Sequence, residues 1–144
     1  MRLLTPITIR NTEITNRIVM SAMHLSYTDN GYANERIYRF YEERAQGGAG
    51  LIMVGGCQID HHGYNSMISV SDDKYIPSLK VLTSRVHRYG SKIGCQLFQA
   101  GRYSFSFLSG VQSVAPSPVY SPLTREVPRE MSTEEVYEVI TAFG

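Results

Sequence analysis

The stretch GLIMVGG, residues 50–56, constrains the fold more than any other part of this sequence. Leu51, Ile52, Met53 and Val54 follow one another without polar alternation, and glycines flank them on both sides. A strand that is apolar on both faces is typical of a parallel sheet covered by helices. The stretch therefore predicts a buried parallel strand within an α/β fold.

Two further segments have the composition of strands: RIVMSA at residues 17–22 and KIGCQLFQ at residues 92–99. Between the three strands, apolar residues recur at helical spacing after Asn34, a candidate N-cap, and again from residue 73 to residue 89. The strand starts are 33 and 42 residues apart, which suits β/α units joined by right-handed crossovers. The pattern predicts three parallel, buried strands.

The flanking segments also carry local signals. Residues 6–15 alternate apolar and polar around a turn and predict a hairpin in which Ile7 and Ile9 face Ile14. A long Ser/Pro-rich connection follows the third strand, and connections of that length are functional or disordered. After it, Ser132 and Glu135 have the spacing of a capping box, which predicts a third helix beginning there.

These elements leave two α/β architectures open. A closed (β/α)8 TIM barrel needs roughly 250 residues, and the 144 residues here hold three predicted strands and three predicted helices. A small open sheet that binds nucleotides needs a glycine loop between a strand and a helix, which the sequence lacks. The last helix has no strand after it. We therefore expect residues 1–144 to be the N-terminal part of a (β/α)8 TIM barrel, with a hairpin and about three βα units, incomplete as given and without a second domain.

Composition excludes several classes of function. The chain is 42% hydrophobic and 19% charged with a formal charge of +1, so bulk electrostatics give no reason to expect a nucleic-acid or membrane-surface partner. No apolar run is long enough to span a bilayer. The N-terminal segment is a poor match to a signal peptide, because Pro6 interrupts its apolar residues. Cys57 and Cys95 form no CxxC motif, which disfavours a disulfide framework or a zinc site and suits a reducing cytoplasm.

Small and hydrogen-bonding residues gather at the predicted carboxyl ends of the strands. They lie at residues 21–24, 55–57 and 96–102. Active sites of barrels lie at these ends, and small residues let a flat ligand approach the backbone closely. The Gln96 amide offers a donor and an acceptor that match the edge of a heterocycle such as a pyrimidine ring, although hydrogen bonds to neighbouring backbone would also explain it.

An ordered set of motifs resembles the Old Yellow Enzyme family of FMN-dependent ene-reductases and NADH:flavin oxidoreductases. The motifs are NRIVMSAMH at 16–24, GLI with the glycine pair at 50–56, GCQLFQAGR at 94–102, APS at 115–117 and PREMS at 128–132. The Met23-His24 pair and GRYS at 101–104 are more similar to the 2,4-dienoyl-CoA reductase branch. The resemblance covers nearly the whole chain in the right order.

The resemblance implies FMN as cofactor, NAD(P)H as reductant and a small-molecule substrate. Hydride would pass through the flavin to an activated C=C such as an enone or a dienoyl thioester. The positions that match the family's flavin contacts are Ser21, Ala22, Met23, His24, Gly56 and Gln96.

Two of the polar residues have alternative roles. His24 matches a position that tunes the flavin, and the other interpretation is a loop histidine that bonds a backbone carbonyl. Arg102 is expected to anchor the following loop or to pair with Glu130, with direct substrate contact as the alternative. The His61-His62 pair is expected to lie in a solvated loop with side chains pointing apart, so no metal site is predicted. Cys57 is expected to be a small buried residue, with a reactive thiol near the site as the alternative.

In the resembling family, the substrate anchor, the proton donor and the phosphate-binding loops lie further along the chain, and iron–sulfur modules lie further still. We therefore expect this chain to be a truncated part, inactive alone and prone to self-association through exposed strand edges. The alternative is a non-catalytic half-barrel that assembles without bound flavin. An intact site would hold flavin and colour the protein yellow.

Overall fold

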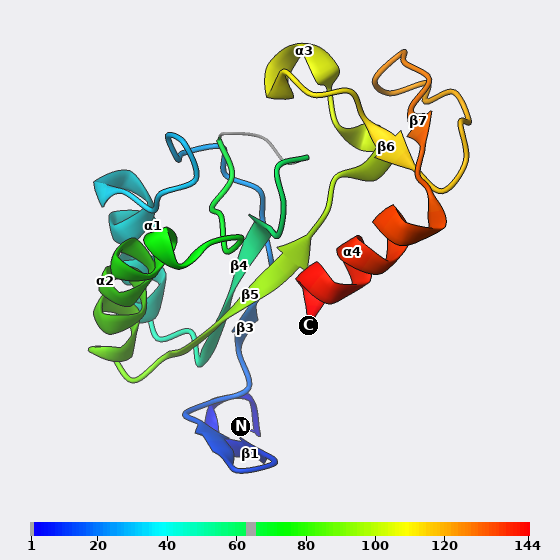
Figure 1. Ribbon diagram of the computed structural model, residues 1–144. Coiled ribbons are helices and arrows are strands. Elements are labelled where there is room, and N and C mark those ends of the chain that lie inside the picture. Colours follow the sequence, from blue (N-terminus) through cyan, green and yellow to red (C-terminus); the bar gives the residue numbers. More distant parts are fainter. Residues whose placement is uncertain (1, 63–65) are drawn as a thin grey trace.

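The computed structural model describes residues 2–62 and 66–144, and its centre is a parallel sheet with helices on one face (Figure 1). The strands are β3 (Val19–Met20), β4 (Leu51–Gln58) and β5 (Lys92–Phe98), in the order β3-β4-β5. Strands that follow one another in the chain are neighbours in the sheet and run parallel, as in the wall of a barrel. The predicted α/β fold is confirmed.

Helices α1 (Glu35–Gln46) and α2 (Ile76–His87, preceded by the 3₁₀ turn η2, Asp73–Tyr75) form the crossovers. The predicted cap is confirmed, because the Asn34 side chain accepts hydrogen bonds from the backbone N–H groups of Arg36 at 3.1 Å and Ile37 at 3.2 Å. Gly90 takes a φ of +80° just before β5, a conformation that suits glycine. Each helix therefore has a local signal that stops or starts it.

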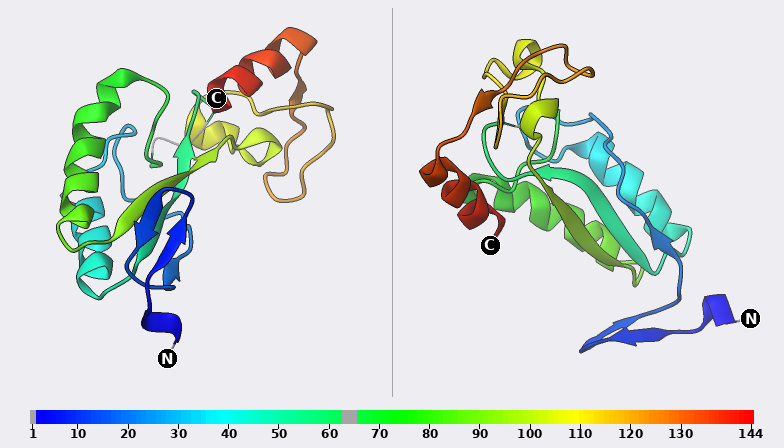
Figure 2. Two further views of the ribbon diagram at one scale, coloured as in Figure 1. Left: turned by 90° about the horizontal axis from the view of Figure 1, so that it is seen from below. Right: turned by 90° about the vertical axis from the view of Figure 1, so that its right-hand side faces the viewer.

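The core lies between the two helices and the face of the sheet that they cover (Figure 2). Ile52 and Val54 of β4 are buried there, at 0% and 3% exposure. Residues of both helices pack against these two side chains: Ile37, Tyr41 and Ala45 of α1, and Leu82 and Val86 of α2. The alternation of β4 turns its other residues, Leu51 and Met53, to the opposite face.

A hairpin lies at the amino-terminal end of the parallel strands (Figure 1). After the 3₁₀ turn η1 (Arg2–Leu4), strands β1 (Ile7–Ile9) and β2 (Thr12–Ile14) pair antiparallel, with Ile7 opposite Ile14 as predicted and Ile9 opposite Thr12. Asn16 then connects this hairpin to the sheet. Its Nδ2 donates to the Gly48 carbonyl at 2.8 Å, and its Oδ1 accepts from Ile18 N at 2.9 Å.

The remaining elements lie beyond the carboxyl ends of the strands (Figure 2). They are η3 (Gly101–Tyr103), α3 (Ser106–Ser109), β6 (Val114–Ala115), β7 (Arg129–Glu130) and α4 (Thr133–Phe143), and β6 pairs parallel with β7. The predicted capping box is confirmed, because Ser132 Oγ accepts from Glu135 N and Glu135 Oε2 accepts from Ser132 N. The long connection thus carries structure of its own.

Two expectations about the strands are wrong. The first strand was expected over residues 17–22 but pairs only at Val19 and Met20. The third strand was expected to be buried, yet Gln96 is exposed and Leu97 is 40% exposed. The reason is that β5 is an edge strand, and no described element covers the face of the sheet that points away from the helices.

Among the described residues, no helix is both long and apolar enough to cross a membrane.

Candidate functional site

A β-bulge shapes the carboxyl end of the sheet. Val54 pairs with Cys95 and Cys57 pairs with Leu97, so Gly55 and Gly56 both lie opposite the single residue Gln96. Gly56 has a φ of +61°, the left-handed conformation that a bulge often assigns to glycine. The bulge reverses the alternation of side chains beyond it, and it bends the end of β4 next to the segment that follows β3.

The backbone after β3 packs directly on this bulge. A Cβ atom added to Gly55 would overlap the backbone N, C and O atoms of Met23. Only a glycine therefore permits the approach of the two chains. Met23 remains 46% exposed on its other side, and Ser21 is also exposed while Ala22 is half-buried. The predicted contact segment 21–24 is thus a shelf of backbone held in place by Gly55.

His24 extends the same shelf toward Gly56. Its ring atoms Cγ and Nδ1 lie 3.9 Å from the position that a Cβ on Gly56 would take, and Met67 Cε lies 2.8 Å from it. Gly56 itself is buried beneath these side chains. Partial desolvation lowers the pKa of His24 below its usual value, so the imidazole is neutral at pH 7. A neutral imidazole carries one N–H donor and one acceptor.

Gln96 occupies the sheet face that points away from the helices. It alternates with Ile93 and Cys95, which lie on the helix side, and shares its own face with Gly94. Gly94 lies beneath Met53, whose Sδ is 3.1 Å from the position of an added Cβ. Gln96 is exposed to solvent. The expectation that this glutamine lies on a buried strand is therefore wrong.

The next glutamine, Gln99, was not predicted as a site residue. Its Oε1 accepts a hydrogen bond from Gly101 N at 2.7 Å and holds the start of η3. Its Nε2 is buried without a hydrogen-bond partner among the described residues. The signal in the sequence was an amide directly after a strand, where polar groups of barrels meet ligands.

Arg102 does not form the expected ion pair with Glu130 among the described residues. Its Nη2 donates to Tyr103 Oη at 3.3 Å, and its guanidinium lies 5.2 Å from the centre of the Tyr103 ring. The Arg102 carbonyl accepts from Thr124 Oγ1 at 3.3 Å, so the backbone of Arg102 helps to hold the following loop. Arg129 of β7, by contrast, does bind a carboxylate.

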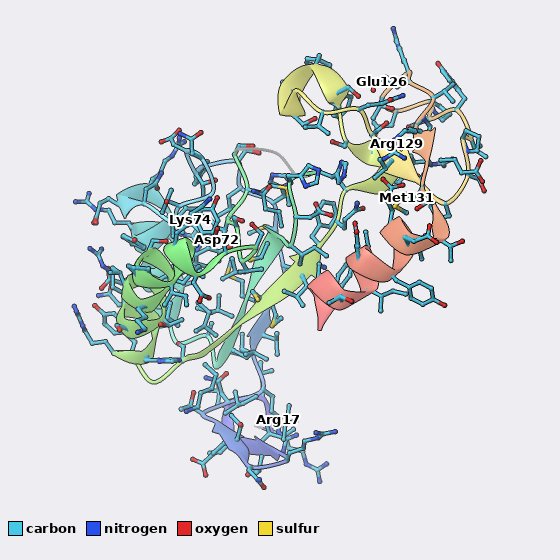
Figure 3. The ribbon with its side chains drawn as sticks, in the orientation of Figure 1. Arg17, Asp72, Lys74, Glu126, Arg129 and Met131 are labelled. Carbon is cyan, nitrogen blue, oxygen red and sulfur yellow. The ribbon has the colours of Figure 1, made fainter. Side chains whose placement is uncertain are left out.

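A hollow lies between the loop that follows β4 and helix α4. It has a volume of about 420 Å³ and is bordered by His61, His62, Arg129 and Glu135, among others. Arg129 belongs to β7, and Figure 3 shows it on the β6–β7 pair, near the start of α4. Arg129 binds Glu135 through two hydrogen bonds of 2.6 and 2.9 Å, and this contact lowers the pKa of Glu135 to about 2.

The His61 and His62 rings do not point apart as predicted. Their centres are 4.1 Å apart at an angle of 37°, and His62 is half-buried. Burial lowers the pKa of His62, which keeps the ring neutral. In residues 2–62 and 66–144, no group of three or more His, Cys, Asp or Glu side chains is placed to hold a metal ion.

Gly55, like Gln99, is a residue of the site to which the sequence assigned no ligand contact. Gly56 was assigned the ligand contact, whereas Gly55 makes the close contact with Met23. Two adjacent glycines inside a strand are a signal for a bulge or a close backbone approach. The sequence does not show which of the two fills which role, because that depends on the register with β5.

Comparison with known proteins agrees with this geometry. Residues 2–144 match the profile of the NADH:flavin oxidoreductase / NADH oxidase family. The chain is 46% identical over 143 residues to a metal reductase of Desulforamulus reducens and 38% identical over 140 residues to an NADH oxidase of Thermoanaerobacter brockii. These matches cover 99% and 94% of this chain but 21% and 22% of the relatives, so the chain spans about a fifth of their length.

Solved structures share the fold. A 2-naphthoyl-CoA reductase in complex with 2-naphthoyl-CoA matches 98% of this chain with a TM-score of 0.90 and 28% identity. An Old Yellow Enzyme homologue from Zymomonas mobilis matches 98% of this chain with a TM-score of 0.88 and 25% identity. The matched regions make up 24% and 42% of those chains. The described strands and helices therefore correspond to part of a larger α/β barrel.

Proposed function

The chain belongs to the NADH:flavin oxidoreductase / NADH oxidase family, and from this premise we propose that it forms one wall of an FMN site in an NAD(P)H-dependent oxidoreductase. The reaction would be the reduction of an activated C=C, such as that of an enone or an enoyl thioester. The observation that carries the proposal is the shelf of backbone at residues 21–24, held by Gly55 and facing the same end of the sheet as Gln96.

The residues present suit a flat, polar ring. The contact between the Met23 backbone and Gly55 holds residues 21–24 close against the carboxyl end of the sheet, where a stacked ring would lie. On the neighbouring strand, Gln96 presents an exposed amide two residues beyond Gly94 on the same face of the sheet. An amide can donate to a carbonyl oxygen and accept from a ring N–H at the pyrimidine edge of an isoalloxazine.

Each residue of this wall would have a distinct part. Ser21, Ala22 and Met23 would support the ring, and Gln96 would orient it. Bound FMN supplies hydride transfer between the nicotinamide and the substrate. A neutral His24 would donate one hydrogen bond to the ring system, and its lowered pKa keeps it from adding a positive charge there at pH 7. Arg102, stacked on Tyr103, would fix the loop that borders the substrate.

The test is FMN binding by the purified chain. After gel filtration with added FMN, the protein peak should carry the visible absorbance of flavin. Gln96→Ala should weaken the affinity about tenfold, because it removes two hydrogen bonds worth about 0.5–1.5 kcal/mol each. Gln46→Ala is the matched control, since Gln46 is an exposed amide at the end of α1. Equal affinities for the two variants would refute the assignment of Gln96.

A non-catalytic half-barrel is the second candidate, and one observation favours it. Apolar side chains are exposed along the edges of the sheet, with Val19 at 54% and Leu97 at 40% exposure. Exposed edges of this kind pair with other chains. On this view the chain would self-associate whether or not flavin is present. Elution as an oligomer without flavin, unchanged by added FMN, would favour the assembly function over the flavin site.

An iron–sulfur cluster would need ligands from outside this sequence. The chain has only Cys57 and Cys95, whereas clusters are usually held by four cysteine thiolates. Both thiols also lie on the sheet rather than in a ligand loop. Any cluster in a protein that contains this chain would therefore bind elsewhere.

A further inference from the structure

The two cysteines of the sequence share one face of the sheet because of the bulge. Val54 and Cys95 are paired, so in a regular β4 Cys57 would lie opposite Phe98 and point away from Cys95. The bulge shifts the register by one residue and pairs Cys57 with Leu97 instead. Cys57 therefore points to the helix side of the sheet, diagonally across from Cys95.

The two thiols contact each other in unlike surroundings. A side-chain hydrogen bond joins them, and both border a hollow of about 270 Å³ between the sheet and α2. Cys57 is 1% exposed, whereas Cys95 is exposed to solvent. The rest of the hollow is mainly apolar, with Val54, Ile68, Val70, Leu79, Leu82 and Ile93. A small oxidant can therefore reach Cys95 directly but not Cys57.

The contact makes the two thiols chemically different. The hydrogen bond from Cys57 lowers the pKa of Cys95 to about 6, and the same bond together with burial raises the pKa of Cys57. The pKa of the neighbouring Tyr41 is raised to about 12, mainly by burial and in smaller part by Cys57, so Tyr41 stays neutral. Cys95 is therefore thiolate more readily than an ordinary cysteine, and thiolate is the form that reacts with oxidants.

We propose that Cys57 and Cys95 form a peroxide-sensitive dithiol that closes to a disulfide between β4 and β5. In the first step the Cys95 thiolate attacks hydrogen peroxide, the O–O bond breaks, and one proton is taken up to give a sulfenic acid and water. In the second step the Cys57 thiol displaces the hydroxyl from Cys95, which releases a second water as the S–S bond forms. The two thiols are oxidised by two electrons, and peroxide is reduced to two waters.

The pair lies directly behind the proposed flavin wall. Gly56 precedes Cys57, and Gln96 follows Cys95. A disulfide draws the sulfur atoms to about 2.05 Å, much closer than a hydrogen bond holds them, so the backbone at Gly56 and Gln96 must shift. Closure should therefore weaken FMN binding severalfold, and this consequence alone rests on the proposed function.

The experiment treats the reduced chain with hydrogen peroxide, unfolds it in denaturant so that both cysteines are accessible, blocks remaining thiols with N-ethylmaleimide and records the intact mass. Wild type should lose two hydrogen atoms per chain and both alkylation sites, and a reductant should restore them. Cys57→Ser keeps a hydrogen-bond donor but cannot form the disulfide, so it should stop at a sulfenic acid on Cys95 that dimedone traps. Cys57→Ala also lacks the donor, and its oxidation should be about tenfold slower. Cys95→Ser should not react.

Several results would overturn the proposal. They are disulfide-linked dimers in place of an internal bond, oxidation of Cys95 past sulfenic acid while Cys57 remains a thiol, or equal rates for wild type and Cys57→Ala. Titration of FMN fluorescence with the reduced and oxidised chain tests the coupling, and equal affinities would refute it. If neither form binds FMN, the proposed function fails, while the mass data still decide the dithiol.

Discussion

Replacing Gly55 by alanine tests the packing that supports the candidate site. The added Cβ would overlap three backbone atoms of Met23, and backbone cannot move aside as a flexible side chain can. The segment after β3 would have to separate from β4. Because Met23 belongs to the proposed flavin shelf, the same displacement should disturb FMN binding.

The expected magnitude follows from two opposing effects. In a strand without steric conflict, glycine to alanine stabilises by about 0.5–1 kcal/mol, because the unfolded chain loses freedom. Overpacking of a well-packed site costs about 1–3 kcal/mol, and a conflict with backbone falls at the upper end. Gly55→Ala should therefore lower the free energy of unfolding by about 2 kcal/mol.

Gly47→Ala provides the matched control. Gly47 ends α1 with a φ of −70°, and an added Cβ would lie 3.4 Å from the Glu43 carbonyl oxygen, an ordinary contact. This variant should be as stable as wild type or up to about 1 kcal/mol more stable. Urea denaturation followed by circular dichroism measures both variants. If Gly55→Ala matched Gly47→Ala in stability and still bound FMN, the close approach of Met23 to β4 would be refuted.

Three further changes test other parts of the fold. Ile52→Ala should lower the free energy of unfolding by about 2–5 kcal/mol in urea denaturation, because Ile52 is completely buried; a loss below 1 kcal/mol would contradict its place in the core. Asn34→Ala removes the cap of α1 and should cost about 1 kcal/mol by the same method, whereas Asn34→Asp should retain most of it. Arg129 lowers the pKa of Glu135 from 4.5 to about 2, so the stabilisation of α4 by the Glu135 carboxylate is present above pH 4.5 and is lost as the pH falls through 2. Glu135→Gln should remove this acid dependence from the circular dichroism of the chain. A pH profile that this variant leaves unchanged would refute the pairing of Glu135 with Arg129.

Local signals in the sequence predicted much of this fold. The helix after Asn34, the apolar run of β4 and the capping box at Ser132 are all confirmed. Each of them depends on residues within one or two turns of the same element, where spacing alone carries the information. The parallel order of the strands followed from the alternation of strands and helices.

The features that were wrong depend on partners distant in the sequence. Burial of β5 was inferred from its composition, but Gln96 is exposed because β5 ends the sheet on one side. Arg102 could not be matched to its neighbour, because the choice between Glu130 and Tyr103 depends on how the loop folds. The same holds for Gly55, since the register between β4 and β5 decides which glycine meets Met23.

FMN binding at the carboxyl ends of β3, β4 and β5 is the property on which the proposed function depends. Titration of the isotope-labelled chain with FMN, followed by backbone amide NMR, tests it residue by residue. We expect the largest shifts at residues 22–24, at Gly55 and Gly56, and at Gln96, while the hairpin at residues 7–14 does not change. Shifts concentrated in the hairpin or around Arg129, or no shifts at saturating FMN, would contradict it.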